Sequence, residues 1–221
     1  MTRGACVNPK TQWLDVSMPL FEGMVCWPGD PEFETRAVSS LSKGDGSNVT
    51  WLGLTTHTGT HVDAPRHIVP DGARLDELDP SVFFGPARVL DLTDAGPRIH
   101  PSDFGEAPLP ARLLLKTANG MLADRREFEP AFTALTTGAA ARLVDEQVQL
   151  VGIDYISIAP EGEDCEAVHR ILLEAGVLIV EGLDLRGVQA GPCEFVVLPL
   201  AVRHGDGAPC RAFIRMEAGD G

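Results

Sequence analysis

The stretch His57-Thr-Gly-Thr-His61-Val-Asp63-Ala-Pro65-Arg-His67 contains three of the chain's six histidines, and its conformation decides how they are placed. His57 and His61 are four residues apart, so in a helix they would share one face. The segment follows a strand-like run, however, and it includes Gly59 and Pro65, which disfavour a helix. We therefore interpret it as a strand that runs into a loop.

In extended backbone, side chains two residues apart point to the same side, so His61 and Asp63 are expected to lie together. A turn at Thr58-Gly59-Thr60 can fold His57 back toward them, because glycine tolerates the backbone angles that such a turn requires. Two imidazoles and a carboxylate would then converge. This donor set suits Zn²⁺, Mn²⁺ or Fe²⁺ and leaves coordination positions open for water and a substrate.

Pro65 restrains Ala64 to extended conformations, and so sets the direction in which His67 leaves the cluster. His67 would then stand near the metal without having to bind it. The alternative for each histidine alone is a surface-loop residue, with Asp63 as an ordinary turn residue. Three histidines and an aspartate at this spacing favour the metal site.

Outside this stretch, short β-branched runs between Gly, Pro and Asp residues predict strands. The predicted strands are 13–20, 48–56, 87–92, 111–117, 150–158, 177–183, 194–202 and 211–216. Two segments predict helices: 137–146, with Thr137 as its N-cap, and 163–175, which ends at Gly176. Each helix is followed closely by a strand. The pattern indicates an α/β or α+β fold, in which residues 1–221 form a single domain with a mixed central sheet flanked by helices.

Composition limits the partners of the chain. Its 221 residues carry a net charge of −14, with only 18 Lys and Arg, so nucleic acid and anionic membranes are not expected to bind. No run of apolar residues is long enough to span a membrane, and residues 1–10 lack the apolar core of a signal peptide. The five widely spaced cysteines include no CxxC motif, which argues against a disulfide framework. We expect a cytoplasmic protein.

Two residues further along the chain are possible partners of the cluster. His169 lies among apolar positions of the second predicted helix, and Glu181 directly follows the apolar run 177–180. A carboxylate at such a position is costly to bury unless it is paired or bound to a metal. From the residues alone, a structural role is favoured for each: His169 as a helix-face residue bonded to a neighbour, and Glu181 as a residue that emerges from a strand into solvent.

The chain resembles the cyclase family, which includes bacterial kynurenine formamidase (arylformamidase) and the isatin-hydrolase-like, metal-dependent hydrolases. The central motif HxGTHxDxPxH is matched in full by the stretch from His57 to His67. Further blocks that resemble the family follow in order: Leu14-Asp-Val-Ser-Met-Pro-Leu20, Trp27-Pro-Gly-Asp30, Val151-Gly-Ile-Asp154, Leu178-Ile-Val-Glu-Gly-Leu-Asp184, Leu198-Pro-Leu200 and Ala208-Pro-Cys-Arg211.

The resemblance implies the swivelling β/β/α fold of the cyclases and a role for each matching residue. His57, His61 and Asp63 would bind a first metal ion, and His169 would bind a second. Asp63 and Glu181 would bridge the two. The implied cofactor is one or two divalent ions, with Zn²⁺ favoured and Mn²⁺ as the alternative.

The resemblance also implies that His67 is the proton donor and acceptor and that Trp27 lines the pocket for a small-molecule substrate. It further implies a homo-oligomer, at least a dimer, in which N-terminal residues of one subunit approach the site of the other.

The predicted function is hydrolysis of a small, non-peptide amide, most simply by an arylformamidase-like enzyme. One alternative is a cyclase, or a hydrolase of lactones or of cyclic amides such as isatin. Another is a non-catalytic structural protein that binds a metal. After Asp154 the chain reads Tyr155-Ile-Ser-Ile-Ala159, which departs from the kynurenine formamidase pattern, so the resemblance does not choose the substrate.

Overall fold

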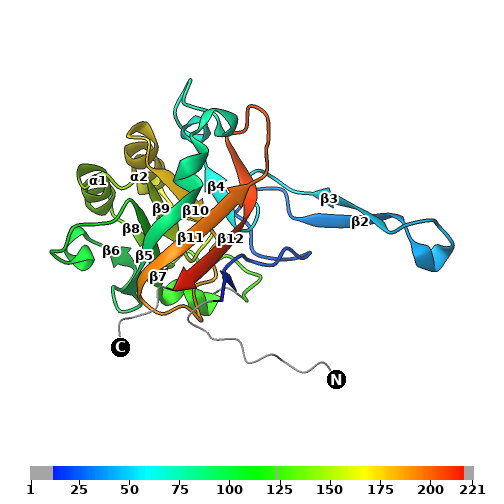
Figure 1. Cartoon of the computed structure of the whole chain (residues 1–221), viewed down its shortest axis with the longest axis horizontal. Coiled ribbons are helices and arrows are strands. Elements are labelled where there is room, and N and C mark those ends of the chain that lie inside the picture. Colours follow the sequence, from blue (N-terminus) through cyan, green and yellow to red (C-terminus); the bar gives the residue numbers. More distant parts are fainter. Residues whose placement is uncertain (1–11, 123, 217–221) are drawn as a thin grey trace.

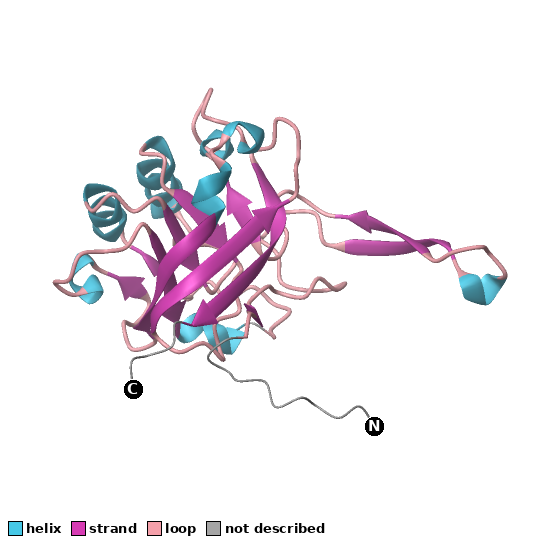
Figure 2. Cartoon of the chain, viewed as in Figure 1, coloured by secondary structure: helices cyan, strands magenta, loops and turns pink. Residues whose placement is uncertain are grey.

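The protein has a body rich in β-strands, from which one long hairpin projects (Figures 1 and 2). The structure is a computed structural model, and it describes residues 12–122 and 124–216. Its strands are β1 (Leu14–Asp15), β2 (Glu34–Ser39), β3 (Val49–Gly53), β4 (His61–Asp63), β5 (Phe84–Leu92), β6 (Arg98–Ile99), β7 (Arg112–Thr117), β8 (Ala134–Leu135), β9 (Leu150–Ile153), β10 (Leu178–Glu181), β11 (Gly191–Pro199) and β12 (Gly207–Met216). Its α-helices are α1 (Thr137–Asp145) and α2 (Glu163–Glu174).

The main sheet closes on itself. Its strand order is β1-β12-β11-β5-β7-β9-β10-β4, and β4 also pairs with β12. The strands β5, β7, β9 and β10 run parallel to one another, whereas the pairs that involve β11, β12 and β4 are antiparallel. The predicted mixed sheet is therefore present as a barrel, in which the three-residue strand β4 completes the ring.

Successive side chains of the parallel strands point alternately into the barrel and out toward the helices, so the hydrophobic core has two parts. In β7, Leu114 packs inside the barrel, whereas Leu113 and Leu115 point outward to the helices. In β10, Val180 points inward and Ile179 points outward in the same way. The outward leucines and isoleucines pack against α1 and α2, which cover this side of the sheet (Figure 1). The outer side of β10 is thus the side that faces α2.

The two helices lie where the sequence predicts them. The N-cap of α1 is Thr136 rather than the predicted Thr137, because the Thr136 hydroxyl accepts a hydrogen bond from the Ala139 amide at 3.2 Å. Helix α2 is followed by Gly176, whose φ of +79° ends the helical conformation as predicted.

The α/β fold class predicted from the sequence is confirmed, with differences at the strand ends. The strands β11 and β12 begin earlier than predicted, at Gly191 and Gly207, since partner strands continue to pair there. The predicted strand 13–20 is reduced to β1 and an isolated bridge at Ser17. The predicted domain, 1–221, includes residues outside the described ranges, so its extent stays a prediction.

Strands β2 and β3 form a separate hairpin, which we call the arm (residues 34–53). Within residues 12–122 and 124–216, β2 and β3 pair as strands only with each other, and the arm projects from the body (Figures 1 and 2). Strand β2 was not predicted, because its sequence ETRAVS has little apolar alternation and nearly all of its residues are exposed. Five of the arm's apolar residues are exposed as well: Val38, Leu41, Val49, Trp51 and Leu52.

Candidate metal centre

Strand β4 places two of the predicted ligands. It lies between β10 and β12, with His61 opposite Glu181 and Asp63 opposite Ile179. Cross-strand partners share a face, so His61, Asp63 and Glu181 all lie on the outer side of the barrel, toward α2. Val62 points the other way into the barrel core. The prediction that His61 and Asp63 lie together is confirmed.

The segment before β4 brings His57 to the same place. A turn at residues 55–58 is held by the Thr58 hydroxyl, and Gly59 adopts a φ of +67°. His57 Nδ1 consequently lies 2.9 Å from Asp63 Oδ1, as the turn prediction requires. The predicted order of strand and then loop was wrong: the motif begins in a loop, continues as β4 and ends in a 3₁₀ turn, Pro65–His67.

Two tightly packed turns fix this arrangement. Gly182, directly after β10, has a φ of +69°, and a Cβ there would lie 2.4 Å from the carbonyl oxygen of Gly59. The Thr60 hydroxyl donates to the carbonyl oxygen of Gly182 at 2.5 Å and accepts from the amide of Met18 at 2.7 Å. The turn at residues 58–60 and the end of β10 are therefore held in close contact, and this contact keeps His61 opposite Glu181.

Hydrogen bonds to the backbone orient two of the imidazoles. His61 Nδ1 lies 2.9 Å from the carbonyl oxygen of Gly59, and His169 Nδ1 lies 2.9 Å from that of Cys165, so both nitrogens donate. The Nε2 atoms then face the carboxylates: His61 Nε2 is 3.3 Å from Glu181, and His169 Nε2 is 3.3 Å from it. Such support of the second ring nitrogen is typical of histidines that bind metals.

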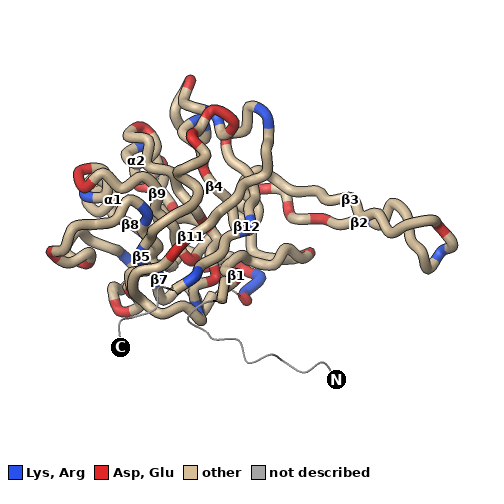
Figure 3. Tube along the Cα trace, viewed as in Figure 1, with Lys and Arg blue, Asp and Glu red and all other residues tan. Residues whose placement is uncertain are grey.

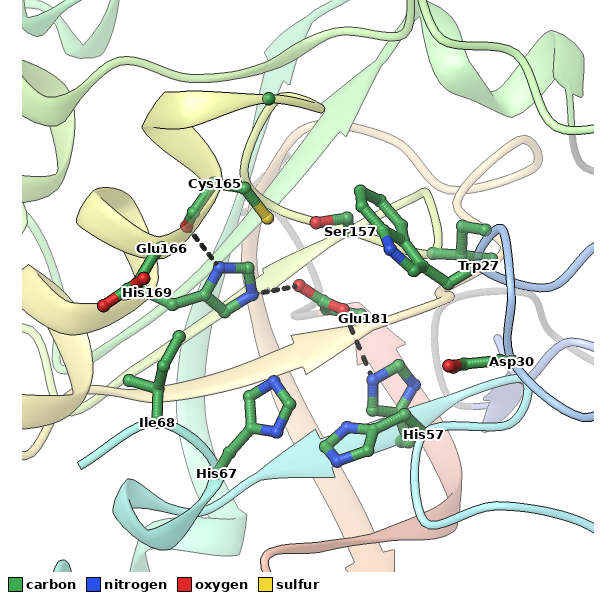
Figure 4. A pocket seen from close by; sticks show the side chains of 13 residues that line it. Trp27, Asp30, His57, His67, Ile68, Ser157, Cys165, Glu166, His169 and Glu181 are labelled. Atoms are coloured by element: carbon green, nitrogen blue, oxygen red, sulfur yellow. Dashed lines mark hydrogen bonds and ion pairs between the residues drawn. The ribbon is translucent and has the colours of Figure 1, made fainter. Parts of the chain in front are cut away.

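The carboxylate of Glu181 contacts both of these rings, and its contact with the ring of His169 is drawn in Figure 4. Its Oε1 accepts a hydrogen bond from the amide of Ile158 at 2.7 Å, which orients the carboxylate. His169 Nε2 is also 3.8 Å from Asp63 Oδ2. The structure thus brings His169 and Glu181 to the motif, as the family resemblance implies.

The donor set fits a divalent metal. Among the described residues, the buried atoms His61 Nε2 and Asp63 Oδ2 have ionisable neighbours at 3.3 Å and 3.8 Å but form no hydrogen bond, a costly state that a metal would relieve. Ligand atoms lie within 4.8 Å of one another in two sets, His57/Asp63/His67 and His61/Asp63/Glu181. Asp63 is the residue that the two sets share. Imidazole and carboxylate donors suit Zn²⁺ and Mn²⁺.

Without a metal ion, a protonated histidine supplies the positive charge beside the carboxylates of the cluster. Burial opposes a charge on His61, but Asp63 and Glu181 outweigh it and raise its pKa to about 10. Burial also opposes ionisation of Asp63, yet His57 and His61 hold its pKa well below the usual value. A metal must displace these protons, so the affinity of the cluster for metal is expected to rise with pH.

His67 differs from the other three imidazoles. Its side chain is 30% exposed, and its ring lies 4.1 Å from the ring of His57 and 5.8 Å from that of His169, measured between centroids. Burial lowers the pKa of His67, which favours the neutral ring at neutral pH. His67 therefore stands at the edge of the cluster, where a neutral imidazole can take up a proton.

A pocket of about 440 Å³ opens above the cluster. The imidazoles and Glu181 lie on one side of it and Trp27 on another (Figure 4). The ring of Phe128 packs edge-on against Trp27 at 5.2 Å between centroids and holds this wall in place. Trp27 is thus at the predicted place beside the pocket.

Two residues at the site, Asp206 and Phe128, were not predicted from the sequence. Asp206 Oδ2 lies 3.1 Å from His57 Nε2. An aspartate between two glycines is typical of any turn, and only the pairing of β12 with β4 places this one at the site. Phe128 lies in a loop without periodicity, so no pattern in the sequence links it to Trp27.

Charged residues form no extended basic surface along the described part of the chain. Acidic residues are spread over the trace, and basic residues lie among them (Figure 3). Within residues 12–122 and 124–216, neither helix is long and apolar enough to cross a membrane. The cytoplasmic location stays a prediction.

Comparisons with known proteins agree with this geometry. The Cyclase family model matches residues 14–160. A kynurenine formamidase of Bacillus cereus is 34% identical over 212 residues, which cover 93% of this chain and 98% of that protein. A solved structure described as a potential metal-dependent hydrolase with cyclase activity superimposes with a TM-score of 0.80 and 31% identity, over 92% of this chain and 97% of that one.

A more distant structure shares the fold. Isatin hydrolase A from Labrenzia aggregata superimposes with a TM-score of 0.79 at 21% identity, and 95% of each chain is covered. The family model and the near full-length relative confirm the resemblance found in the sequence. This chain belongs to the cyclase family.

Proposed function

We propose that this protein is a metal-dependent hydrolase of a small aryl amide, and most specifically of an N-formyl aryl amide. The observation that carries the proposal is the cluster of imidazoles and carboxylates beneath a pocket with an aromatic wall, in which two buried atoms form no hydrogen bond to any described residue. Relatives named kynurenine formamidase, 34–36% identical over nearly the whole chain, support the reaction class.

In this proposal His57, His61 and Asp63 would hold a first metal ion and His169 would hold a second, with Asp63 and Glu181 as ligands that the two ions would share. Zn²⁺ is the favoured ion, with Mn²⁺ as the alternative, because both accept mixed imidazole and carboxylate donors. When bound, a divalent ion supplies Lewis acidity, which lowers the pKa of water and polarises a carbonyl group.

The remaining steps belong to the side chains around the pocket. His67 takes the proton of the attacking water and returns it to the nitrogen of the leaving amine. Its lowered pKa keeps it neutral, and thus able to accept that proton, at neutral pH. Trp27, held by Phe128, offers an apolar wall on which an aromatic substrate stacks.

A panel of substrates tests the reaction class. We expect the metal-loaded protein to consume N-formylkynurenine or a simple formanilide faster than isatin or an aryl lactone, measured by absorbance at matched concentrations. Preference for isatin or for the lactone would replace the formamidase proposal with one of the alternative hydrolases. A metal-loaded protein that consumes none of these compounds would favour a structural role for the metal.

We also propose that the protein is a homo-oligomer in which the arm contacts a second copy. A two-stranded hairpin is only marginally stable alone, and this one exposes five apolar side chains. The arm carries two acidic and two basic residues, whereas the whole chain has a net charge of −14. An arm without net charge that exposes apolar side chains can approach an acidic second copy without strong repulsion.

Replacing Leu52 by lysine tests the role of the arm, because Leu52 is 51% exposed on β3. We expect sedimentation velocity to show a dimer or larger assembly for the unmodified protein and a shift toward monomer for Leu52→Lys. Met121→Lys is the matched control, since Met121 is an exposed apolar residue of the body. A monomeric unmodified protein, or equal effects of both changes, would contradict the proposal.

A further inference from the structure

Asp206 is the last residue of the loop that precedes β12, and its backbone is bonded to the residue that follows β4. Its carbonyl oxygen accepts a hydrogen bond from the amide of Ala64 at 2.9 Å, and the next residue, Gly207, pairs with Asp63. A Cβ on Gly207 would lie 2.6 Å from the carbonyl oxygen of Val62 and 3.1 Å from Cε1 of His57. Glycine at this position therefore lets the backbone of Asp206 pass close beside the His57 ring.

The carboxylate of Asp206 lies beside two imidazoles. Its Oδ2 is 3.1 Å from Nε2 of His57 and 4.0 Å from Nδ1 of His67. Only the contact with His57 is within hydrogen-bond distance. The other nitrogen of His57, Nδ1, points to Asp63 at 2.9 Å. His57 is therefore held between two carboxylates, one on each ring nitrogen.

These two carboxylates compete for the single proton of a neutral imidazole. If the proton were on Nδ1, it would be donated to Asp63, and the nitrogen facing the cluster would have no lone pair for a metal. With the proton on Nε2, it is donated to Asp206, and Nδ1 presents its lone pair to the cluster. Asp206 is the acceptor that favours this second form.

We infer that Asp206 is a positioning residue, which fixes the tautomer and ring orientation of His57 and thereby prepares it to bind the metal. The inference rests on the proposed metal-dependent function, and it assigns to Asp206 the part that backbone carbonyl oxygens play for His61 and His169. All three histidines would then have their second nitrogen supported, which is the usual arrangement for metal ligands.

Metal affinity is the readout that tests this role. We expect Asp206→Ala to weaken Zn²⁺ binding by about 10–100-fold, measured by competition with a chromophoric chelator, and Asp206→Asn to have a smaller effect because its amide oxygen can still accept. Asp76→Asn is the matched control: Asp76 supports the same loop through the amide of His204, at 3.1 Å, and is not among the residues that line the pocket. Circular dichroism of the metal-free proteins checks that each variant is folded.

A double-mutant cycle separates positioning from a general disturbance of the loop. If Asp206 acts through His57, Asp206→Ala should cause no further loss of affinity in a His57→Ala background. An equal loss in both backgrounds, or unchanged affinity of Asp206→Ala in the otherwise native chain, would overturn this inference alone. A native chain that binds neither Zn²⁺ nor Mn²⁺ would overturn the proposed function as well.

Discussion

Replacing Asp63 by asparagine is expected to remove bound metal and to lower hydrolysis by about 10³-fold or more. Asp63 is fully buried, belongs to both sets of ligand atoms and has an oxygen without a hydrogen-bond partner among the described residues. Asparagine has the same shape, but it lacks the negative charge and one of the two acceptor oxygens. Lewis-acid catalysis contributes several kcal/mol, and about 1.4 kcal/mol corresponds to a tenfold change in rate.

The measurement is metal content per chain after dialysis, together with the rate on the best substrate of the panel. Asp154→Asn is the matched control, because Asp154 is also a buried aspartate. Burial raises its pKa to about 7, so a neutral side chain suits this position, and its partners are the amide and hydroxyl of Thr117. We expect this control to keep its metal. Full metal content in Asp63→Asn would contradict the assignment of Asp63 as a shared ligand.

Replacing His67 by alanine is expected to lower turnover by about 10²-fold or more while the metal stays bound. The reason is that general acid–base catalysis by one side chain contributes about 10²–10⁴-fold. His67 lies at the edge of the pocket, and Asp206 is its one carboxylate neighbour within 4.0 Å among the described residues. His204→Ala is the control, since His204 is an exposed histidine outside the pocket.

Metal analysis of the same variant decides between two roles of His67. Its ligand atom lies within 4.8 Å of those of His57 and Asp63, so the geometry also permits His67 to be a ligand. Loss of metal in His67→Ala would make it a ligand rather than the acid–base group. Unchanged turnover with metal retained would exclude both roles.

The core of the site could be predicted from the sequence because it depends on local geometry. The alternation of His61 and Asp63 placed them on one face, and Gly59 allowed the turn that returns His57. The order of loop and strand could not be predicted in the same way. Strand β4 has only three residues, and its conformation is set by its two neighbouring strands rather than by its own pattern.

The distant parts of the site depend on tertiary pairing. His169 and Glu181 lie more than a hundred residues after His61, and only the family resemblance linked them to the motif. The pairing of β10 with β4 places Glu181 opposite His61. Helix α2 covers the outer face of the same sheet and so brings His169 to the motif. Asp206 reaches the site through the pairing of β12 with β4, for which the sequence carries no local signal.

The decisive measurement for the proposed function is whether hydrolysis of an aryl formamide depends on a bound metal ion. The protein would be treated with a chelator, dialysed and assayed on a formanilide before and after Zn²⁺ or Mn²⁺ is restored, with circular dichroism recorded at each stage. We expect the metal-free protein to stay folded and inactive, and a divalent ion to restore the activity. Full hydrolysis by the metal-free protein would contradict the proposed metal-dependent function.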